Sequence, residues 1–424
     1  MTAALPYVGL AALAAAGVPI FALLGALALW LFHADGIQST AVIIELARLS
    51  SLPALIAIPL FTFAGYVLAE SGAPKRLVAL AEALFGWLPG GVAVAGLGAC
   101  AMFTAFTGAS GVTIIALGGL VYPLLRRQGY PEDFSLGLVS TTGSLGLLFP
   151  PSLPIILYAL VGGISVNKLF AAATVPGLFL IVLLSGYAVA VAVRAGVKRT
   201  AFSWRTALRA ARAAAWELPL PVIVVGGIYG GFFTASEAAA VMAFYVVVVE
   251  TLVYRDVPWS KMPEVARQSM ILVGAIMIVL GCALGLTSYL IDAEIPGRLF
   301  TFLHAHVGSA WEFLAILNVF LLVVNMIEIF SAIVIVVPII APVAIQYGIS
   351  PVHLGALFLL NLEIGYMTPP LGLNLFLASR RFDRSLPELY RAVFPFWLLL
   401  LAALMIVTYF PAMSLWLPKL LRYP

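Results

Sequence analysis

The chain has 424 residues, of which 63% are hydrophobic and only 9% carry charge. This balance excludes a water-soluble globular protein, because a soluble surface of this size needs far more charge. A backbone in lipid must satisfy its own hydrogen bonds, so it forms helices or a closed barrel. The apolar runs at 218–228 and 271–286 lack the alternation of a barrel strand and therefore predict helices. The net charge of +4 is spread over short loops, which does not indicate nucleic-acid binding.

The apolar runs predict an all-α polytopic membrane protein, since a crossing helix needs about 20 apolar residues. Full crossings are predicted at 6–32, 52–70, 131–162, 169–193, 213–231, 235–253, 266–290, 351–379 and 388–416. Two further regions, 88–127 and 309–347, each hold a pair of apolar runs with a polar interruption, at Thr107–Gly111 and Asn325–Glu328. The shorter amphipathic segments 37–50, 75–86 and 295–306 are predicted to lie along the membrane surface as arms.

Basic residues give the predicted orientation. They gather in four groups, at 126–127, 194–212, 255–267 and 380–384, which the positive-inside rule places in the cytoplasm. The crossing count agrees only if both interrupted regions are re-entrant hairpins that leave on the side they entered. The second region has no Lys or Arg between Trp311 and Pro351, so it opens to the opposite face. The alternative, two ordinary crossings in each region, would place one basic group on the wrong side.

An internal repeat appears when the chain is shifted by 219 positions. Pro123 then falls on Pro342, Gly129 on Gly348, Gly146 on Gly365, and Pro150-Pro151 on Pro369-Pro370. In both copies an interrupted hairpin precedes a crossing broken at Gly-x-x-x-Pro-Pro, and the loops orient the copies oppositely. We therefore predict an inverted repeat with two broken helices, unless these common residues coincide by chance. Corresponding breaks in inverted repeats indicate the binding site of a transporter.

The broken helices suggest which residues carry chemistry. Two consecutive prolines unwind a helix, and the freed carbonyls must be buried in protein or bind something. Oxygen ligands suit a hard cation such as sodium, and helix N-termini favour an anion. The predicted sodium ligands are Thr107, Ser110, Gly143, Ser144 and Gly146 in the first half, and Ser331, Gly365 and Thr368 in the second. The predicted substrate contacts are Thr113, Ser152, Glu328, Gly372 and Asn374. Each of the Gly, Ser and Thr residues could instead serve close helix packing.

Two carboxylates lie within this apolar region. Glu328 and Glu363 are the only ones between Glu312 and Asp383. Intramembrane carboxylates are costly and usually functional. Either could neutralise a cation, carry a proton, or hydrogen-bond to a helix end.

Four stretches of the sequence resemble the large membrane subunit of tripartite ATP-independent periplasmic (TRAP) transporters. They are Gly17-Val18-Pro19, Ala57–Phe61 with Ala64-Gly65, Gly143–Gly146 with Pro150–Pro154, and Asn361–Gly365 with Thr368–Asn374. The resemblance implies organic-acid uptake across a bacterial inner membrane, driven by sodium as the coupling ion. It also implies an elevator motion, in which a transport domain with both hairpins moves against a scaffold.

The resemblance further implies two protein partners: a periplasmic substrate-binding protein and a separate small four-helix membrane subunit. It places sodium at the hairpin tips and helix breaks, in agreement with the residues above. One departure concerns the first tip, which in the family often reads Ser-Gly-Ser. Here it reads Thr107-Gly108-Ala109-Ser110, so position 109 supplies no hydroxyl.

The repeat and the resemblance together predict the domain boundaries. Residues 1–87 hold scaffold helices and a first arm, and 88–165 the first half of the transport domain. Residues 166–308 hold further scaffold helices and a second arm, 309–385 the second half, and 386–424 a C-terminal helix.

Several functions are compatible with these residues. We expect the membrane subunit of a sodium-driven uptake system for small organic anions, either carboxylates or sulfonates. The alternative is a sodium- or proton-coupled dicarboxylate carrier that needs no binding protein. A channel would require an open water path. An intramembrane enzyme would require a catalytic set such as His-Glu-x-x-His, which the sequence lacks, so we do not expect an enzyme.

Overall fold

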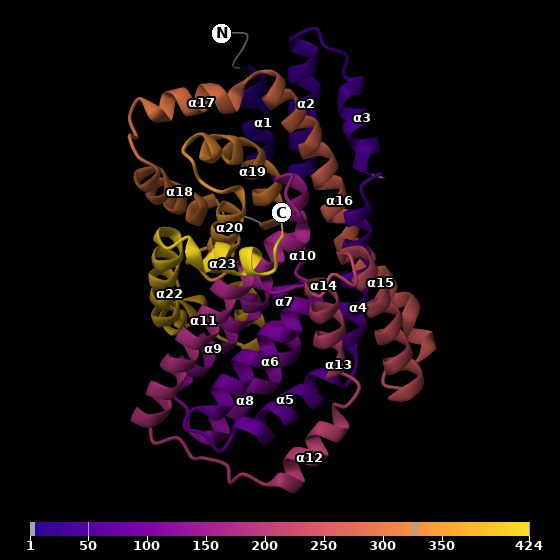
Figure 1. Cartoon of the computed structure of the whole chain (residues 1–424), viewed down its shortest axis with the longest axis vertical. Helices are drawn as coiled ribbons and strands as arrows, with labels where there is room; N and C mark the ends of the chain where they lie inside the picture. Colours follow the sequence, from indigo (N-terminus) through magenta and orange to yellow (C-terminus); the bar gives the residue numbers. More distant parts are fainter. Residues whose placement is uncertain (1–4, 50, 325–328, 424) are drawn as a thin grey trace.

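The computed structural model describes residues 5–49, 51–324 and 329–423, and every regular element in these ranges is a helix (Figure 1). Six helices are long and apolar enough to cross a membrane, or seven if one bent pair counts as a single span. The six are Pro53–Glu70, Val166–Arg194, Ala235–Val253, Trp259–Asp292, Ile329–Gln346 and Leu386–Tyr409. The prediction of an all-α polytopic membrane protein is confirmed.

The first predicted crossing, 6–32, is wrong. The structure has two helices there, α1 (Leu5–Ala15) and α2 (Ile20–Ala34). Gly17 has a φ of +82°, which a glycine adopts readily, and the fixed φ of Pro19 precedes α2. The rings of Tyr7 and Trp30 lie 5.1 Å apart, so α1 folds back along α2.

The segment predicted as an arm at 37–50 does not lie across the end of the molecule. It forms α3 (Thr40–Leu49), which runs upright beside the long helix α16 (Met262–Asp292) in Figure 1. A Cβ built on Gly285 would lie 2.8 Å from Val42 Cγ1, and one built on Gly281 would meet Leu46. These glycines let α3 approach α16 closely in antiparallel orientation. The other predicted arms form α5 (Ala73–Phe85) and α17 (Ile295–His304), at opposite ends of the molecule.

The first interrupted region is a helical hairpin. Helix α6 (Gly91–Thr107) ends at Gly108, whose φ is +64°, and α7 (Ser110–Thr113) follows. A π-helical turn (Ile114–Gly118) leads into α8 (Gly119–Gln128). A Cβ built on Gly96 would lie 3.0 Å from Val121 Cγ1. These two residues are nearly equally far along the chain from the tip at Gly108, so α6 and α8 run antiparallel.

The second interrupted region is also a hairpin in its described part. Its helices are α18 (Ala310–Val324) and α19 (Ile329–Gln346). The ring of Phe313, near the start of α18, stacks 4.7 Å from that of Tyr347, just after α19. The start of α18 and the end of α19 therefore meet, as expected for the two arms of a hairpin.

Both crossings with double prolines are broken. The first consists of α9 (Glu132–Leu145), a 3-10 turn (Gly146–Leu148) and α10 (Leu153–Val161), bent by 44°. The second consists of α20 (Pro351–Gly365) and α21 (Leu373–Phe382). Helices α9 and α20 begin 219 residues apart, and α6 and α18 also begin 219 residues apart, so the helix bounds follow the spacing of the predicted repeat.

The remaining helices surround these elements. Helix α11 (Val166–Arg194) packs against α6, α20 and α23 (Ala412–Leu420), and α22 (Leu386–Tyr409) packs against α9 and α20. Helix α4 (Ala57–Glu70) packs against α15 (Ala235–Val248) and α16. The other elements are 3-10 turns at Pro53–Ile56 and Trp259–Lys261, α12 (Trp204–Ala213), α13 (Pro219–Pro221), α14 (Gly227–Tyr229), and π-helical turns at Val222–Gly226 and Val249–Val253.

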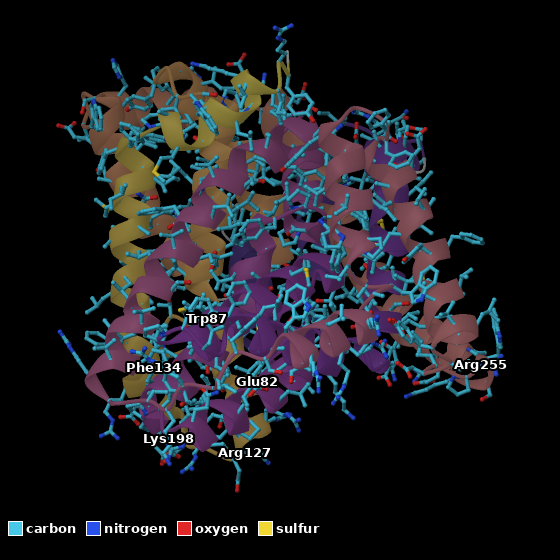
Figure 2. All side chains as sticks on the ribbon, turned by 60° about the horizontal axis from the view of Figure 1, so that its bottom comes forward. Glu82, Trp87, Arg127, Phe134, Lys198 and Arg255 are labelled. Carbon is cyan, nitrogen blue, oxygen red and sulfur yellow. The ribbon has the colours of Figure 1, made fainter. Side chains whose placement is uncertain are left out.

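The four basic groups lie at one end of the molecule, which Figure 2 turns forward. Arg127, Lys198 and Arg255 are labelled there, and the Lys198 amide donates to the Gln128 carbonyl at 3.3 Å. Arg384 forms an ion pair with Glu132, at the start of α9. This arrangement agrees with the prediction that the four groups share one side.

Candidate functional site

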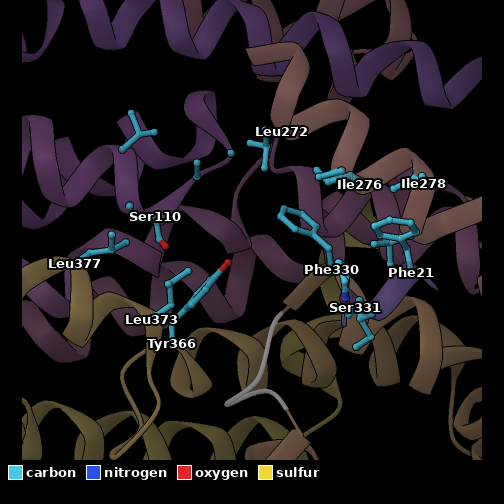
Figure 3. Close-up of a pocket in the computed structure, with 18 of the residues that line it drawn as sticks. Phe21, Ser110, Leu272, Ile276, Ile278, Phe330, Ser331, Tyr366, Leu373 and Leu377 are labelled. Atoms are coloured by element: carbon cyan, nitrogen blue, oxygen red, sulfur yellow. The ribbon is translucent and has the colours of Figure 1, made fainter. Parts of the chain in front are cut away.

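A cavity of about 680 Å³ lies between the first hairpin tip and the start of α19 in the second hairpin. Figure 3 shows Ser110 of the first tip and Tyr366 of the second helix break on one side, with Phe330 and Ser331 of the second hairpin on the other. The rest of the lining is largely apolar and comes mainly from α2, α4, α16 and α21, including Phe21, Ile276 and Leu373. The structure thus brings two of the predicted sodium ligands, Ser110 and Ser331, to one space.

The first tip is held by close backbone packing. A Cβ built on Gly108 would lie 2.6 Å from Leu153 Cδ1, so the tip contacts the start of α10. A Cβ on Gly111 would lie 2.7 Å from Leu377 Cδ1 of α21. The Thr107 hydroxyl is buried and lies 3.5 Å from the carbonyl oxygens of Thr104 and Ala109. The tip therefore touches the broken helices of both halves.

The first helix break contacts this tip. A Cβ built on Gly143 would lie 3.2 Å from the Ser110 carbonyl oxygen, and one on Gly146 would meet the backbone of α6. Ser144 is fully buried, and its hydroxyl donates to the Thr141 carbonyl at 3.2 Å. Thr113 is also buried, with its oxygen 2.7 Å from that of Thr104.

Hydrogen bonds within the protein already reach several of the carbonyls that we expected the breaks to free. The Gly143 oxygen lies 3.0 Å from the Thr104 hydroxyl, and that of Gly146 accepts from Phe149 N at 3.1 Å. In the second half, Gly365 O accepts from Thr368 N at 3.1 Å, and Thr368 O from Gly372 N at 2.9 Å. A carbonyl has two lone pairs, so each of these oxygens retains one for a cation.

The second break joins the two halves. The side chain of Asn374 donates from Nδ2 to the Ser140 carbonyl of α9 at 3.1 Å. The backbone N–H of Asn374 donates to the Tyr366 carbonyl at 3.0 Å. The Thr368 hydroxyl donates to Ile364 O at 2.8 Å and accepts from Trp397 Nε1 at 3.0 Å. The two halves are thus connected directly at their breaks.

Four buried side chains near the breaks carry polar atoms without a hydrogen-bond partner among the described residues. They are the Ser152 hydroxyl, Asn361 Oδ1, Asn374 Oδ1 and both oxygens of Glu363. Buried polar groups are normally paired, so each of these atoms is a candidate contact for an ion, a water molecule or the substrate. Glu328, the remaining predicted contact, lies outside the described residues.

Sequence reasoning missed several residues that position the site. Thr104 links α6 to the first break, Trp397 holds Thr368, and Tyr366 lines the cavity. Thr104 precedes Thr107 by three residues on α6, a spacing that places both on one helix face. The contacts of Trp397 and Tyr366 depend on tertiary packing, so the sequence alone carried no signal for them.

Comparisons with known proteins agree on one family. The family model described as "Tripartite ATP-independent periplasmic transporter, DctM component" matches residues 7–413. A C4-dicarboxylate TRAP transporter large permease from Pseudomonas aeruginosa is 40% identical, over 93% of this chain and 92% of that one. An ectoine/5-hydroxyectoine TRAP large permease from Ruegeria pomeroyi is 33% identical, over 86% of each chain.

One further relative and one solved structure of similar fold extend the comparison. An isethionate TRAP permease named DctMQ, from Oleidesulfovibrio alaskensis, is 35% identical over 94% of this chain, which spans only 64% of that protein. The solved structure of the YdaH transporter from Alcanivorax borkumensis shares the fold, with a TM-score of 0.62, 15% identity and 89% of each chain covered. The family match and the sequence identities place this chain, a protein of the inner membrane, among the large permease subunits of the TRAP transporters.

Proposed function

We propose that this subunit carries a small organic anion together with sodium ions, by an elevator motion. The observation that supports this most directly is the cavity shared by the first hairpin tip and the start of α19, bordered by Tyr366 of the second helix break. Relatives are named for C4-dicarboxylates and isethionate, which are anions, and we propose a carboxylate or sulfonate as the substrate here. The proposed partners are a periplasmic substrate-binding protein and a small four-helix membrane subunit. The basic end faces the cytoplasm in this proposal.

The charge of the cavity supports cation coupling. Neither its lining nor the sequence at 325–328 contains Lys or Arg. An anion taken from water into an apolar space loses hydration, and a nearby opposite charge offsets that cost. With no fixed cation in the lining, mobile cations supply this charge. Sodium suits the hydroxyl and carbonyl oxygens at the first tip and at the two helix breaks, whereas a purely proton-coupled carrier would rely on Glu328 or Glu363.

Each proposed sodium site combines oxygens from one hairpin with oxygens from the helix break of the same half. In the first half, the side chains of Thr107, Ser110 and Ser144 accompany the carbonyls of Gly143 and Gly146. In the second half, Ser331 and Thr368 accompany Gly365. The unpartnered Ser152 hydroxyl and Asn374 Oδ1 stand at the starts of α10 and α21, where helix dipoles favour an anion. Thr113, Gly372 and Glu328 complete the proposed substrate contacts.

The packing supports one moving body that contains both halves. The Asn374–Ser140 hydrogen bond and the Gly111–Leu377 contact join the hairpins and breaks of the two repeats. Helices α11 and α22 pack against elements of both halves, so we assign them to the same body, which for α11 replaces the expectation that residues 166–308 belong to the scaffold. Helices α2, α4, α15 and α16, which pack among themselves, form the proposed scaffold.

Uptake into proteoliposomes tests the proposal, with the cognate small subunit and the loaded binding protein supplied. Uptake should require a sodium gradient at fixed pH and should fail without the binding protein. Ser110→Ala and Thr368→Ala should raise the sodium concentration for half-maximal uptake. As matched controls, Ser269→Ala and Thr251→Ala remove buried hydroxyls that bond only within their own helices.

Three outcomes would contradict the proposal. Uptake that follows a pH gradient without sodium would indicate proton coupling. Uptake without the binding protein would favour the independent carrier. Unitary currents across a planar bilayer would indicate a channel. Unchanged sodium dependence in both site variants would remove Ser110 and Thr368 from the sites while leaving the transport proposal intact.

A further inference from the structure

A strongly basic segment follows α11 at the basic end of the molecule. Arg194, Lys198, Arg199, Arg205, Arg209 and Arg212 lie within 19 residues, and no Asp or Glu occurs between Asp133 and Glu217. Among the residues that the structure describes, none of these six cations forms an ion pair with a carboxylate. The segment therefore presents positive charge that the protein itself leaves uncompensated.

A cavity of about 450 Å³ lies between α12 of this segment and the arm helix α5. Arg209 supplies its one basic side chain, and Glu82 of α5 its one acidic side chain. Hydroxyls of Thr200, Ser203 and Thr206 also line it. The cavity thus combines a cation, a carboxylate and several hydroxyl groups, which suits a ligand with both an anionic group and hydroxyl donors.

Aromatic side chains form the rim of this cavity. Trp87, which Figure 2 shows near Glu82 on the basic end, and Phe202 meet edge to face at 6.4 Å. Phe202 lies 6.5 Å from Trp204. All three rings are exposed, and tryptophan is enriched where a membrane meets water. A basic amphipathic helix with aromatic residues is typical of segments that lie in this interface.

We propose that this cavity binds the headgroup of an anionic phospholipid of the cytoplasmic leaflet, namely phosphatidylglycerol. Arg209 binds the phosphate, and the Glu82 carboxylate accepts hydrogen bonds from the glycerol hydroxyls. The neighbouring unpaired cations favour an anionic lipid over a zwitterionic one. The exposed rings of Trp87, Phe202 and Trp204 lie along the acyl chains. The leaflet assignment rests on the orientation given under the proposed function.

The bound lipid would brace a junction between the arm and the first hairpin. Thr200 N donates to the Gly86 carbonyl, at the end of α5, at 3.0 Å. Gln128 Nε2, at the outer end of the hairpin, donates to the Thr200 hydroxyl at 3.3 Å. Thr200 also lines the cavity, so a headgroup there touches the residue that joins the two elements.

Native mass spectrometry of the full-length, delipidated protein tests the proposal without measuring transport. Phosphatidylglycerol and phosphatidylethanolamine with identical chains are titrated against the wild type, Arg209→Ala and Arg212→Ala. Arg212 lies on the same helix and is also unpaired, but it does not line the cavity, so its variant is the matched control. Arg209 is exposed, so its replacement leaves the fold intact.

We expect Arg209→Ala to weaken phosphatidylglycerol binding by about fivefold or more, from the energy of one basic residue near an anionic lipid. Arg212→Ala should bind it within about twofold of the wild type, because a surrounding charge contributes less than a direct contact. Glu82→Leu should weaken binding of phosphatidylglycerol but not of phosphatidic acid, which lacks the diol. Equal losses in both arginine variants, or equal binding of phosphatidylethanolamine to the wild type, would overturn the proposal. Because the readout is binding, either result leaves the transport function untouched.

Discussion

The contact between α4 and the first hairpin tip gives a sharp prediction for Gly65→Ala. A methyl group at Gly65 would lie 2.7 Å from the Phe106 carbonyl oxygen, and the Thr107 Cα would lie nearer still. The carbonyl distance is about 0.7 Å shorter than the 3.4 Å at which ordinary contact begins. Both obstructing atoms belong to the backbone, so the tip itself must move. Overpacking of this kind costs about 1–3 kcal/mol.

Gly98→Ala is the matched control, because Gly98 lies within α6, the hairpin helix whose end Gly65 contacts, and nothing approaches its added methyl group within 4 Å. Each variant replaces a helical glycine, which gains about 1 kcal/mol of helix propensity. The gain cancels in the comparison, so Gly65→Ala should be about 1–3 kcal/mol less stable than Gly98→Ala.

The difference in stability can be measured by intrinsic fluorescence while both variants are heated in detergent. Gly65→Ala should show a lower apparent melting temperature than Gly98→Ala. A displaced tip also moves Thr107 and Ser110, so sodium activation of uptake should weaken in the same variant. Equal melting temperatures for the two variants would refute the reasoning, since the tip would then yield at no cost.

Two further predictions concern buried polar clusters. Arg76→Met removes the cation that contacts Glu217, Asp256 and the fully buried Glu250, so it should destabilise the protein by about 3–5 kcal/mol; chemical denaturation in detergent measures this. Asn361 Nδ2 donates to Asn318 Oδ1 at 2.9 Å inside the bundle. In a double-mutant cycle of alanine variants, the effects of the two substitutions on the free energy of unfolding should therefore differ from additivity by about 0.5–3 kcal/mol.

Each of these predictions has a simple control. Arg267 forms its ion pair with Glu264 on the surface, so Arg267→Met should change stability by no more than about 1 kcal/mol. Burial alone would lower the pKa of Arg76, but hydrogen bonds to Asp256 and Glu217 raise it above its ordinary value, so its charge persists at any working pH. Additive alanine substitutions at Asn318 and Asn361 would show that their contact contributes nothing.

Much of the architecture follows from hydrophobic runs and their interruptions. Long apolar stretches predicted crossing helices, and the polar residues at 107–111 marked the first tip. The double prolines marked both breaks, because proline cannot continue a helix interior. The break at Gly17–Pro19 was missed, since glycine and proline also occur within intact membrane helices.

Features that depend on tertiary contacts could not be predicted from local patterns. The amphipathic face of α3 suits a membrane surface as well as the glycine-lined side of α16, and only packing selects the second. Likewise, Arg76 meets partners 141 to 180 residues away in the chain, which no local pattern reveals. At the breaks, the double prolines predicted freed carbonyls that must be buried or bind something, and backbone amides three or four residues along the chain donate to several of them.

The segment between α11 and α12 limits how far these two helices can move apart. It comprises residues 195–203, and a fully extended chain spans at most about 3.6 Å per residue. The nine residues of this segment therefore span at most about 32 Å, which limits how far the end of α11 can separate from the start of α12. Two of its backbone amides, at Lys198 and Thr200, also bond to Gln128 and Gly86 on different elements. A large displacement of α8 relative to α5 must break one of these two backbone hydrogen bonds. The breaking of that bond is a separate step, whose rate single-molecule measurements could determine.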